Sequence, residues 1–306
     1  TVLTGCSRAD DLVQEQAEPE NYALTVFTAQ ERKEWEPVIK EFEERTGWNV
    51  RVETGSAKEM LSQLEKEEAD WDVAFGVSAD ALEEGKEYWQ TGKDAWTGYS
   101  AVSFVILYNT NVVTYRELPT GWDSLLEPRW KGRVAVPDPL KSDMAASVLT
   151  EAAKNSEKEE FLDLLAENMQ YQMPETFKEV EQGISDGRYS IGVTSEEAAK
   201  AMLAAGQDVD YIDPEEGECF FEDGTAIRKR TPNLDASEAF VTYTTCDDTK
   251  WLLRTQLLRQ PAEDVSAEND RSDEELKQRY SRQQEILNIW KLIMEEKTGP
   301  AHEQEQ

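Results

Sequence analysis

Apolar and polar positions from residue 23 onward alternate between the period of β-strands and that of amphipathic helices. Residues 24–27 form a short β-rich run. In the segment 31–46 that follows, Val38 and Phe42 fall on one helical face, and Gly47 is suited to end the helix. The chain therefore opens with a strand followed by a helix.

The same alternation continues to the end of the chain. We expect further strands at 48–52, 71–75, 102–108, 133–136, 190–193, 209–212 and 225–230. We expect further helices at 58–67, from residue 79, and at 144–154, 159–169, 176–185, 236–244, 249–258 and 272–297, the last as one helix or two joined ones. Strands that alternate with helices favour an α/β fold, with mostly parallel sheets flanked by helices.

Composition narrows the class of protein. With 306 residues, of which 39% are hydrophobic, the chain is long enough for two packed lobes. The formal net charge is −32, and no stretch rich in Lys and Arg interrupts it. The negative electrostatic field of such a chain repels polyanions, so we expect no nucleic-acid partner. Most of the excess acid is expected on solvated helix faces.

The sequence contains few of the residues and motifs that enzymes use for catalysis. The single histidine, His302, lies in the polar tail, which removes catalytic systems that need a histidine base. No nucleophile elbow, zinc-protease helix or phosphate loop occurs in the sequence. Adjacent acids such as Glu215 and Glu216 arise by chance in so acidic a chain. We expect neither an enzyme nor a bound cofactor.

Two cysteines lie within the predicted globular part. Cys219 and Cys246 can form a disulfide in an oxidising compartment, or remain two reduced, buried thiols. No histidine or third cysteine stands beside them, which argues against zinc.

Several segments, in order and spacing from about residue 23 to 294, resemble one known family. They are 24–29, 42–47, Trp71-Asp72-Val73-Ala74-Phe75-Gly76, 78–82, Tyr108-Asn109-Thr110, Trp122-Asp123-Ser124-Leu125, Pro128-Arg129-Trp130-Lys131-Gly132-Arg133, Val136-Pro137-Asp138-Pro139, 191–194 and 214–217. The chain resembles the extracellular solute-binding proteins of bacterial ABC importers, in the branch that includes ferric-iron, 2-aminoethylphosphonate and sugar-phosphate binders.

The resemblance implies a two-lobed, periplasmic-binding-protein-like α/β fold with a hinge and an interlobe cleft that closes on the solute. We expect one lobe from 23–101 plus 213–265, the other from 102–212 plus 266–297, and a flexible tail at 298–306. We expect the chain to cross between the lobes near 102–107 and 210–213. The implied function is capture of a small polar solute, anionic or zwitterionic, by a monomer that delivers it to the ABC permease and ATPase complex. Two alternatives remain: ferric-iron binding for an iron importer, and presentation of a ligand to a membrane sensor kinase.

The chain start resembles a lipobox. Leu3-Thr4-Gly5-Cys6 matches the site at which bacterial lipoproteins are cut before a lipidated cysteine. Residues 1–22 are then the end of a signal peptide, the lipid-carrying Cys6 and a polar tether. This implies an extracytoplasmic protein that is anchored to the bacterial cell membrane by lipid.

Loops that follow predicted strands and precede helices are the expected ligand contacts, because free N–H groups gather at helix starts. The hydroxyls among them also suit plain helix caps, so both roles stay open. The expected solute-binding residues are Thr28, Ala29, Gln30, Gly55, Ser56, Gly76, Ser78, Ser142, Asp143, Met144, Thr194 and Glu216.

Two positions depart from the family pattern. Relatives commonly have Ser-Gly where this chain has Ser142-Asp143, and a carboxylate there is expected to occupy a helix N-terminus and repel a phosphate. Ferric binders carry adjacent tyrosines after the strand at 190–193, where this chain has Thr194-Ser195-Glu196-Glu197. We therefore rank iron second as ligand and expect no metal site.

Overall fold

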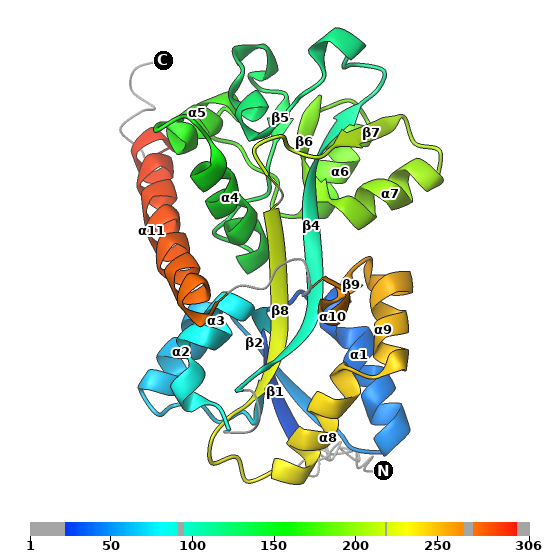
Figure 1. Cartoon of the computed structure of the whole chain (residues 1–306), viewed down its shortest axis with the longest axis vertical. Coiled ribbons are helices and arrows are strands. Elements are labelled where there is room, and N and C mark those ends of the chain that lie inside the picture. Colours follow the sequence, from blue (N-terminus) through cyan, green and yellow to red (C-terminus); the bar gives the residue numbers. More distant parts are fainter. Residues whose placement is uncertain (1–21, 91–94, 218, 266–271, 299–306) are drawn as a thin grey trace, which may run out of the picture.

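The chain forms two α/β lobes stacked along the long axis of the molecule (Figure 1). A computed structural model describes residues 22–90, 95–217, 219–265 and 272–298. The strands are β1 Leu24–Thr28, β2 Val50–Thr54, β3 Val73–Ser78, β4 Thr97–Asn109, β5 Val134–Ala135, β6 Ile191–Ser195, β7 Val209–Ile212, β8 Cys219–Ile227 and β9 Gln260–Pro261. The helices are α1 Arg32–Thr46, α2 Ala57–Glu65, α3 Ala79–Glu84, α4 Asp143–Asn155, α5 Phe161–Asn168, α6 Phe177–Ser185, α7 Glu196–Ala204, α8 Leu234–Thr244, α9 Asp247–Leu252, α10 Ala262–Val265 and α11 Asp273–Thr298.

The first lobe, which contains β1–β3, α1–α3 and α8–α10, is built on three parallel strands in the order β2-β1-β3. On one sheet face, Val38 and Phe42 of α1 pack with Phe240 of α8. On the other face, Met60 of α2 packs in a cluster with Trp71. Alternate residues of β1 and β3 divide between the two clusters, as a strand with helices on both sides requires. The expected α/β fold is confirmed.

The second lobe, which contains β5–β7 and α4–α7, uses a mixed arrangement. Both β6 and β7 pair antiparallel with the far half of β4, and β5 pairs parallel with β6. Phe104 and Ile106 enter a core with α4 and α5 on one face, while Val105 and Leu107 enter a core with α6 and α7 on the other. Within the described ranges, β1–β9 belong to one nine-stranded sheet that runs through both lobes.

Two long antiparallel strands join the lobes. β4 pairs with β8 from Thr97 to Phe104, so both strands run from one lobe into the other (Figure 1). Tyr99 lies in the first-lobe core, whereas Val102 and Phe221 lie in the second-lobe core. The hinge therefore lies at the middle of these two strands.

The second crossing differs from our expectation at 210–213. β7 pairs with the second-lobe half of β4, and the Glu215 N–H donates to the Thr120 carbonyl, so this segment stays in the second lobe. The chain returns through β8 instead. The helix α11, expected in the second lobe alone, contacts α3 of the first lobe as well as α4 and α5 of the second.

The disulfide we considered between Cys219 and Cys246 does not form. Cys219 packs in the second-lobe core, whereas Cys246 packs against the core of the first lobe. The cysteines thus lie in different lobes. Of the alternative with two buried thiols, Cys219 is buried as expected, whereas Cys246 is only half-buried.

Residues 1–21, including the lipobox and Cys6, and the tail from 299 lie outside the described residues. Within the described part, no helix is long and apolar enough to cross a membrane.

Candidate functional site

A cavity of about 390 Å³ lies between the two lobes. We call it the interlobe cleft. Its first-lobe wall is the start of α1 and the turn that follows α9, and its second-lobe wall is α6 with the start of α7; these elements lie on one side of the hinge strands (Figure 1). Its lining includes Glu31, Lys33, Glu34, Leu258 and Arg259 from the first lobe, Val102 from the hinge, and Met144, Phe177, Lys178, Glu181 and Ser195 from the second.

A buried arginine forms the inner edge of the first-lobe wall. Arg259 is 4% exposed, and its Nη1 donates to Asp223 Oδ2 at 2.7 Å and to Ser100 Oγ at 2.9 Å. Its Nη2 donates to Glu34 Oε1 at 2.9 Å. Both terminal nitrogens of Arg259 are therefore engaged by the protein, which leaves the guanidinium poorly placed to bind an anionic solute.

The charges of this network are set by burial and by mutual attraction. Burial lowers the pKa of Arg259, but the carboxylates of Glu34 and Asp223 raise it overall, so the guanidinium stays charged. Burial raises the pKa of Asp223, against the opposing effect of Arg259. For Glu34 burial also acts to raise the pKa, yet the charge of Arg259 lowers it overall.

Opposite this network, α6 presents a carboxylate to the cleft. The side chain of Glu181 is 12% exposed, and its Oε1 accepts a hydrogen bond from Thr194 Oγ1 at 2.8 Å. Its Oε2 lies 3.7 Å from Nζ of Lys178, whose side chain is 75% exposed. Phe177, one turn away on the same helix, stacks on Phe104 and adds an apolar face. Because exposed lysines move freely, Glu181 retains capacity to accept hydrogen bonds from a solute.

Charges of both signs line the cleft, and each lysine stands beside a glutamate. Lys33 Nζ lies 2.9 Å from Glu31 Oε2 on the first-lobe wall, as Lys178 does near Glu181 on the second. A solute that carries both charges can replace both pairs at once, whereas a simple anion would leave the glutamates unpaired. The arrangement thus suits a zwitterionic or polyhydroxyl solute.

Of the residues expected from the sequence, Met144 lines the cleft. Three serines act as helix caps: Ser56, Ser78 and Ser142 accept the backbone N–H of Glu59, Ala81 and Ala145. Both roles were open for these serines, and the structure shows the capping role.

The loops after β1 and β3 lie behind the cleft wall. Thr28 is fully buried, and its Oγ1 accepts the N–H of Gln30. The Gln30 side chain turns inward and donates to Asp223 Oδ2 at 2.9 Å. It lies directly over Gly76, where an added Cβ would come within 2.3 Å of Gln30 Cδ and where φ is +62°. These loops are filled by the protein's own side chains.

The other expected residues are distributed over several places. Ala29 packs against the first-lobe core, and Gly55 lies against the ring of Phe27. Asp143 accepts a hydrogen bond from the Ala57 N–H, across the lobes. Thr194 is fully buried and supports Glu181.

Glu216 does not lie at the cleft, contrary to our expectation. Its carboxylate accepts the backbone N–H groups of Trp122 and Asp123 at 2.9 and 3.1 Å, within the second lobe. Gly121 permits this approach, because an added Cβ there would collide with the Glu216 carboxylate.

Sequence reasoning missed Glu34, Glu181 and Arg259. Glu34 and Glu181 sit on helices whose acidic residues suit a solvated face. Arg259 follows a single π turn, Leu253–Leu257, in an apolar stretch. The sequence carries no signal that separates Arg259 from its neighbour Arg254, because two leucines precede each of them and only the folded structure shows which guanidinium is buried.

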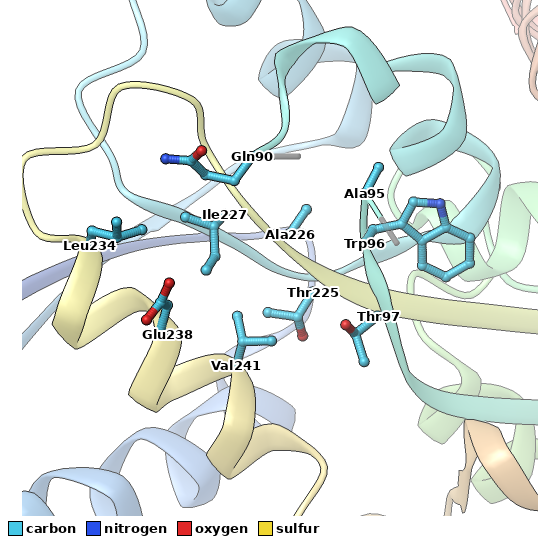
Figure 2. A pocket seen from close by; sticks show the side chains of 10 residues that line it. All are labelled: Gln90, Ala95, Trp96, Thr97, Thr225, Ala226, Ile227, Leu234, Glu238 and Val241. Atoms are coloured by element: carbon cyan, nitrogen blue, oxygen red, sulfur yellow. The ribbon is translucent and has the colours of Figure 1, made fainter. Parts of the chain in front are cut away.

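A second cavity, of about 220 Å³, lies in the first lobe between β8 and α8. Figure 2 shows Thr97, Thr225 and Glu238 around it, with Trp96 at one end and Leu234 at the other. We call it the lower cavity. Every lining residue belongs to the first-lobe part of the fold, so lobe motion does not shape it.

Among the described residues, no group of three or more His, Cys, Asp or Glu side chains is arranged to hold a metal ion.

Residues 76–284 match the model of the family described as "Bacterial extracellular solute-binding protein". The chain belongs to this family. "Iron uptake protein A1" of Synechocystis is 22% identical, with 79% of this chain and 76% of that protein covered.

Solved structures of similar fold are two-lobed periplasmic binding proteins. The "Ferric binding protein from Campylobacter jejuni" gives a TM-score of 0.70 at 17% identity, and covers 88% of this chain and 99% of that one. The periplasmic binding protein AfuA from Actinobacillus pleuropneumoniae, with fructose-6-phosphate bound, gives 0.65 at 16% identity over 78% and 83%. The family places this solute-binding protein outside the cytoplasm.

Proposed function

We propose that this protein is the solute-binding component of an ABC importer, and that it captures a small zwitterionic or polyhydroxyl solute in the interlobe cleft. The observation that carries the proposal is the cleft itself, because charged side chains from both lobes line one cavity beside the hinge strands. A solute that contacts both walls stabilises the closed form, which the permease then recognises.

The role is binding without chemistry. Arg259 and its carboxylates are paired with each other, and the cleft residues make hydrogen bonds and ion pairs suited to holding a polar solute. We further propose that Cys6 carries a lipid that tethers a monomeric protein to the outer face of the cell membrane. The sensor-kinase alternative uses the same cleft and differs in the membrane partner.

Ferric iron is the second candidate, because several of the similar proteins and solved structures have iron or ferric in their names or titles. Iron would need hard oxygen ligands, and Glu31, Glu34 and Glu181 line the cleft. Glu34 is already held by Arg259, and Thr194-Ser195-Glu196-Glu197 stands where ferric binders carry tyrosines. We therefore place the organic solute first.

A thermal-shift screen tests this choice. We expect the melting temperature to rise with one of the zwitterions, such as amino acids and aminophosphonates, or with polyols, and to stay constant with inorganic phosphate. Sugar phosphates, ferric chloride and ferric citrate complete the set. A rise with ferric salts alone, together with a coloured complex, would transfer the proposal to iron.

A further inference from the structure

The long C-terminal helix α11 packs against both lobes. Tyr280, in its first half, packs against the first-lobe cluster that contains Trp71, whereas Trp290 and Ile293, in its second half, lie in the second-lobe core. The helix contacts α3 of the first lobe and both α4 and α5 of the second. Within the described residues, a helix therefore bridges the lobes in addition to the strands β4 and β8.

A buried arginine of α11 touches both lobes at once. Arg279 is 6% exposed, and its Nε lies 3.3 Å from Asp80 Oδ2 of α3 and 3.2 Å from Glu151 Oε1 of α4. Its Nη2 donates to Ser147 Oγ of α4 at 2.7 Å and to the Phe220 carbonyl of β8 at 2.9 Å. One guanidinium thus contacts the first lobe, the second lobe and a hinge strand. We call Arg279, Asp80 and Glu151 the interlobe triad.

The acids of the interlobe triad are buried as well as the arginine. Asp80 is 4% exposed and Glu151 is 6% exposed. A carboxylate that leaves water is costly to bury unless a cation pairs with it, and Arg279 is the buried cation beside both acids. Because charges attract more strongly where water is excluded, moving either lobe away from α11 at this point would break a strong contact.

The arginine at the cleft is buried to a similar degree but pairs within one lobe. The acids that Arg259 contacts are Glu34 of α1 and Asp223, which lies in the part of β8 that pairs with β3 of the first lobe. Burial of an arginine does not by itself tie the lobes together. The acids of Arg279 do so because they come from different lobes.

The interlobe triad and the interlobe cleft lie on opposite sides of the hinge strands. Helices α11, α3 and α4 lie on one side of β4 and β8, whereas α7 and α9 lie on the other (Figure 1). On the side of α7, the lobes meet through a hydrogen bond from Gln260 Nε2 to Glu197 Oε1 at 3.2 Å, and the Glu197 side chain is 33% exposed. A solvated contact of this kind is weaker than a buried ionic one, so it is the contact that gives way when the lobes move.

We propose that the interlobe triad is the pivot of the lobe motion: it holds both lobes against α11, and they rotate about this edge when the cleft opens. The strands β4 and β8 bend at their middle, while α11 remains packed on both lobes at Arg279. Opening therefore separates Gln260 from Glu197 and leaves the triad intact. The proposal does not depend on the solute, because every group in it belongs to the chain.

Distances between spin labels on the solute-free protein test the proposal. Trp251→Cys in α9 and Leu203→Cys in α7 place labels on the cleft side, and Glu65→Cys in α2 and Leu164→Cys in α5 place them on the side of α11 (Figure 1). The accessible native thiols are first replaced by serine. Double electron–electron resonance is expected to give a broad distance distribution for the cleft-side pair and a narrow one for the α11-side pair.

Two variants remove the pivot to different extents. Arg279→Met leaves the two buried acids facing each other, and the α11-side distribution is expected to broaden at least to the width of the cleft-side one. Asp80→Asn keeps the shape of the side chain and leaves Arg279 and Glu151 as a neutral pair, so it should broaden the same distribution by less. It carries the test alone if Arg279→Met does not fold.

Arg259→Met is the matched control, because it also removes a buried arginine but breaks ion pairs within the first lobe. Its α11-side distribution is expected to stay as narrow as that of the wild type.

Equal widths for the two label pairs in the wild type would overturn the proposal. So would an Asp80→Asn variant that keeps the wild-type width on the side of α11, or an Arg259→Met variant that broadens it as much as Arg279→Met does. Because no solute is present, each of these outcomes leaves solute binding in the cleft to be judged by its own experiment.

Discussion

The interlobe cleft and the lower cavity differ in which parts of the fold enclose them. The cleft has one wall from each lobe and carries paired charges of both signs. The lower cavity is enclosed by β8, α8 and the start of β4, all in the first lobe, and its main polar groups are Thr97, Thr225, Gln90 and Glu238 (Figure 2). Lobe motion can open and close the first and leaves the second unchanged.

The difference teaches that cavity size alone does not identify the binding site in this molecule. Both cavities are large enough for small molecules. A transport protein must also signal that it is loaded, and a solute does so only where its contacts differ between the open and closed forms. The cleft meets this condition.

The largest expected effect concerns the arginine at the cleft. Arg259→Met leaves the buried carboxylates of Asp223 and Glu34 uncompensated, so we expect the free energy of unfolding to fall by about 3–5 kcal/mol. Denaturant unfolding measures the loss. The control is Arg254→Met, whose half-exposed guanidinium pairs with Asp264 and whose loss should cost about 1 kcal/mol or less. Equal losses in the two variants would show that the buried Arg259 network stabilises the fold no more than an exposed ion pair does.

A smaller effect is expected from the aromatic residue on the second-lobe wall. Phe177→Ala removes the ring stacked on Phe104, whose centroids lie 5.5 Å apart, and should lower the free energy of unfolding by about 2 kcal/mol because the ring is only partly buried. Leu234→Ala, at the rim of the lower cavity and 39% exposed, should cost about 1 kcal/mol or less. Thermal and denaturant unfolding compare the two. A larger loss of unfolding free energy in Leu234→Ala than in Phe177→Ala would contradict this order of effects.

The smallest effect tests whether the hydroxyl of Ser195 caps α7. This serine lines the cleft and its side chain accepts the Ala198 N–H at the start of α7. Ser195→Ala should lower the free energy of unfolding by about 1 kcal/mol, while Ser195→Thr, which keeps the hydroxyl, should lower it by a few tenths. Denaturant unfolding curves of the two variants measure both losses. If both lose the same amount, the hydroxyl is not the cap.

Most of the fold could be predicted because its elements carry local signals. The helix over 31–46 was indicated by the spacing of Val38 and Phe42, and it forms as α1. β8 was predicted only from residue 225, because Glu222-Asp223-Gly224 has the composition of a turn. Asp223 is tolerated inside this strand because Arg259 and Ser100 satisfy its carboxylate, and these partners lie 36 and 123 residues away.

The cleft was harder to predict for the same reason. Helix-start serines such as Ser56 and Ser142 can be located from local sequence, but whether each caps a helix or touches a solute depends on the opposite lobe. Asp143 was expected at a helix N-terminus, and it is the first residue of α4. Its carboxylate also reaches the start of α2 in the other lobe, and only the folded arrangement could show that. Glu181 accepts a hydrogen bond from Thr194 and shares the cleft with residues of the first-lobe wall. The spacing of residues within α6 does not predict either relation.

The most direct test of the central claim is calorimetric titration of the strongest organic solute from the thermal-shift screen against two matched variants. Glu181→Gln removes the carboxylate charge from the cleft, and Glu238→Gln makes the same change in the lower cavity. Loss of a buried charged contact should weaken binding by roughly tenfold or more in Glu181→Gln, while Glu238→Gln binds as the wild type does. Unchanged affinity in Glu181→Gln together with weakened binding in Glu238→Gln would contradict the account and place the solute in the lower cavity.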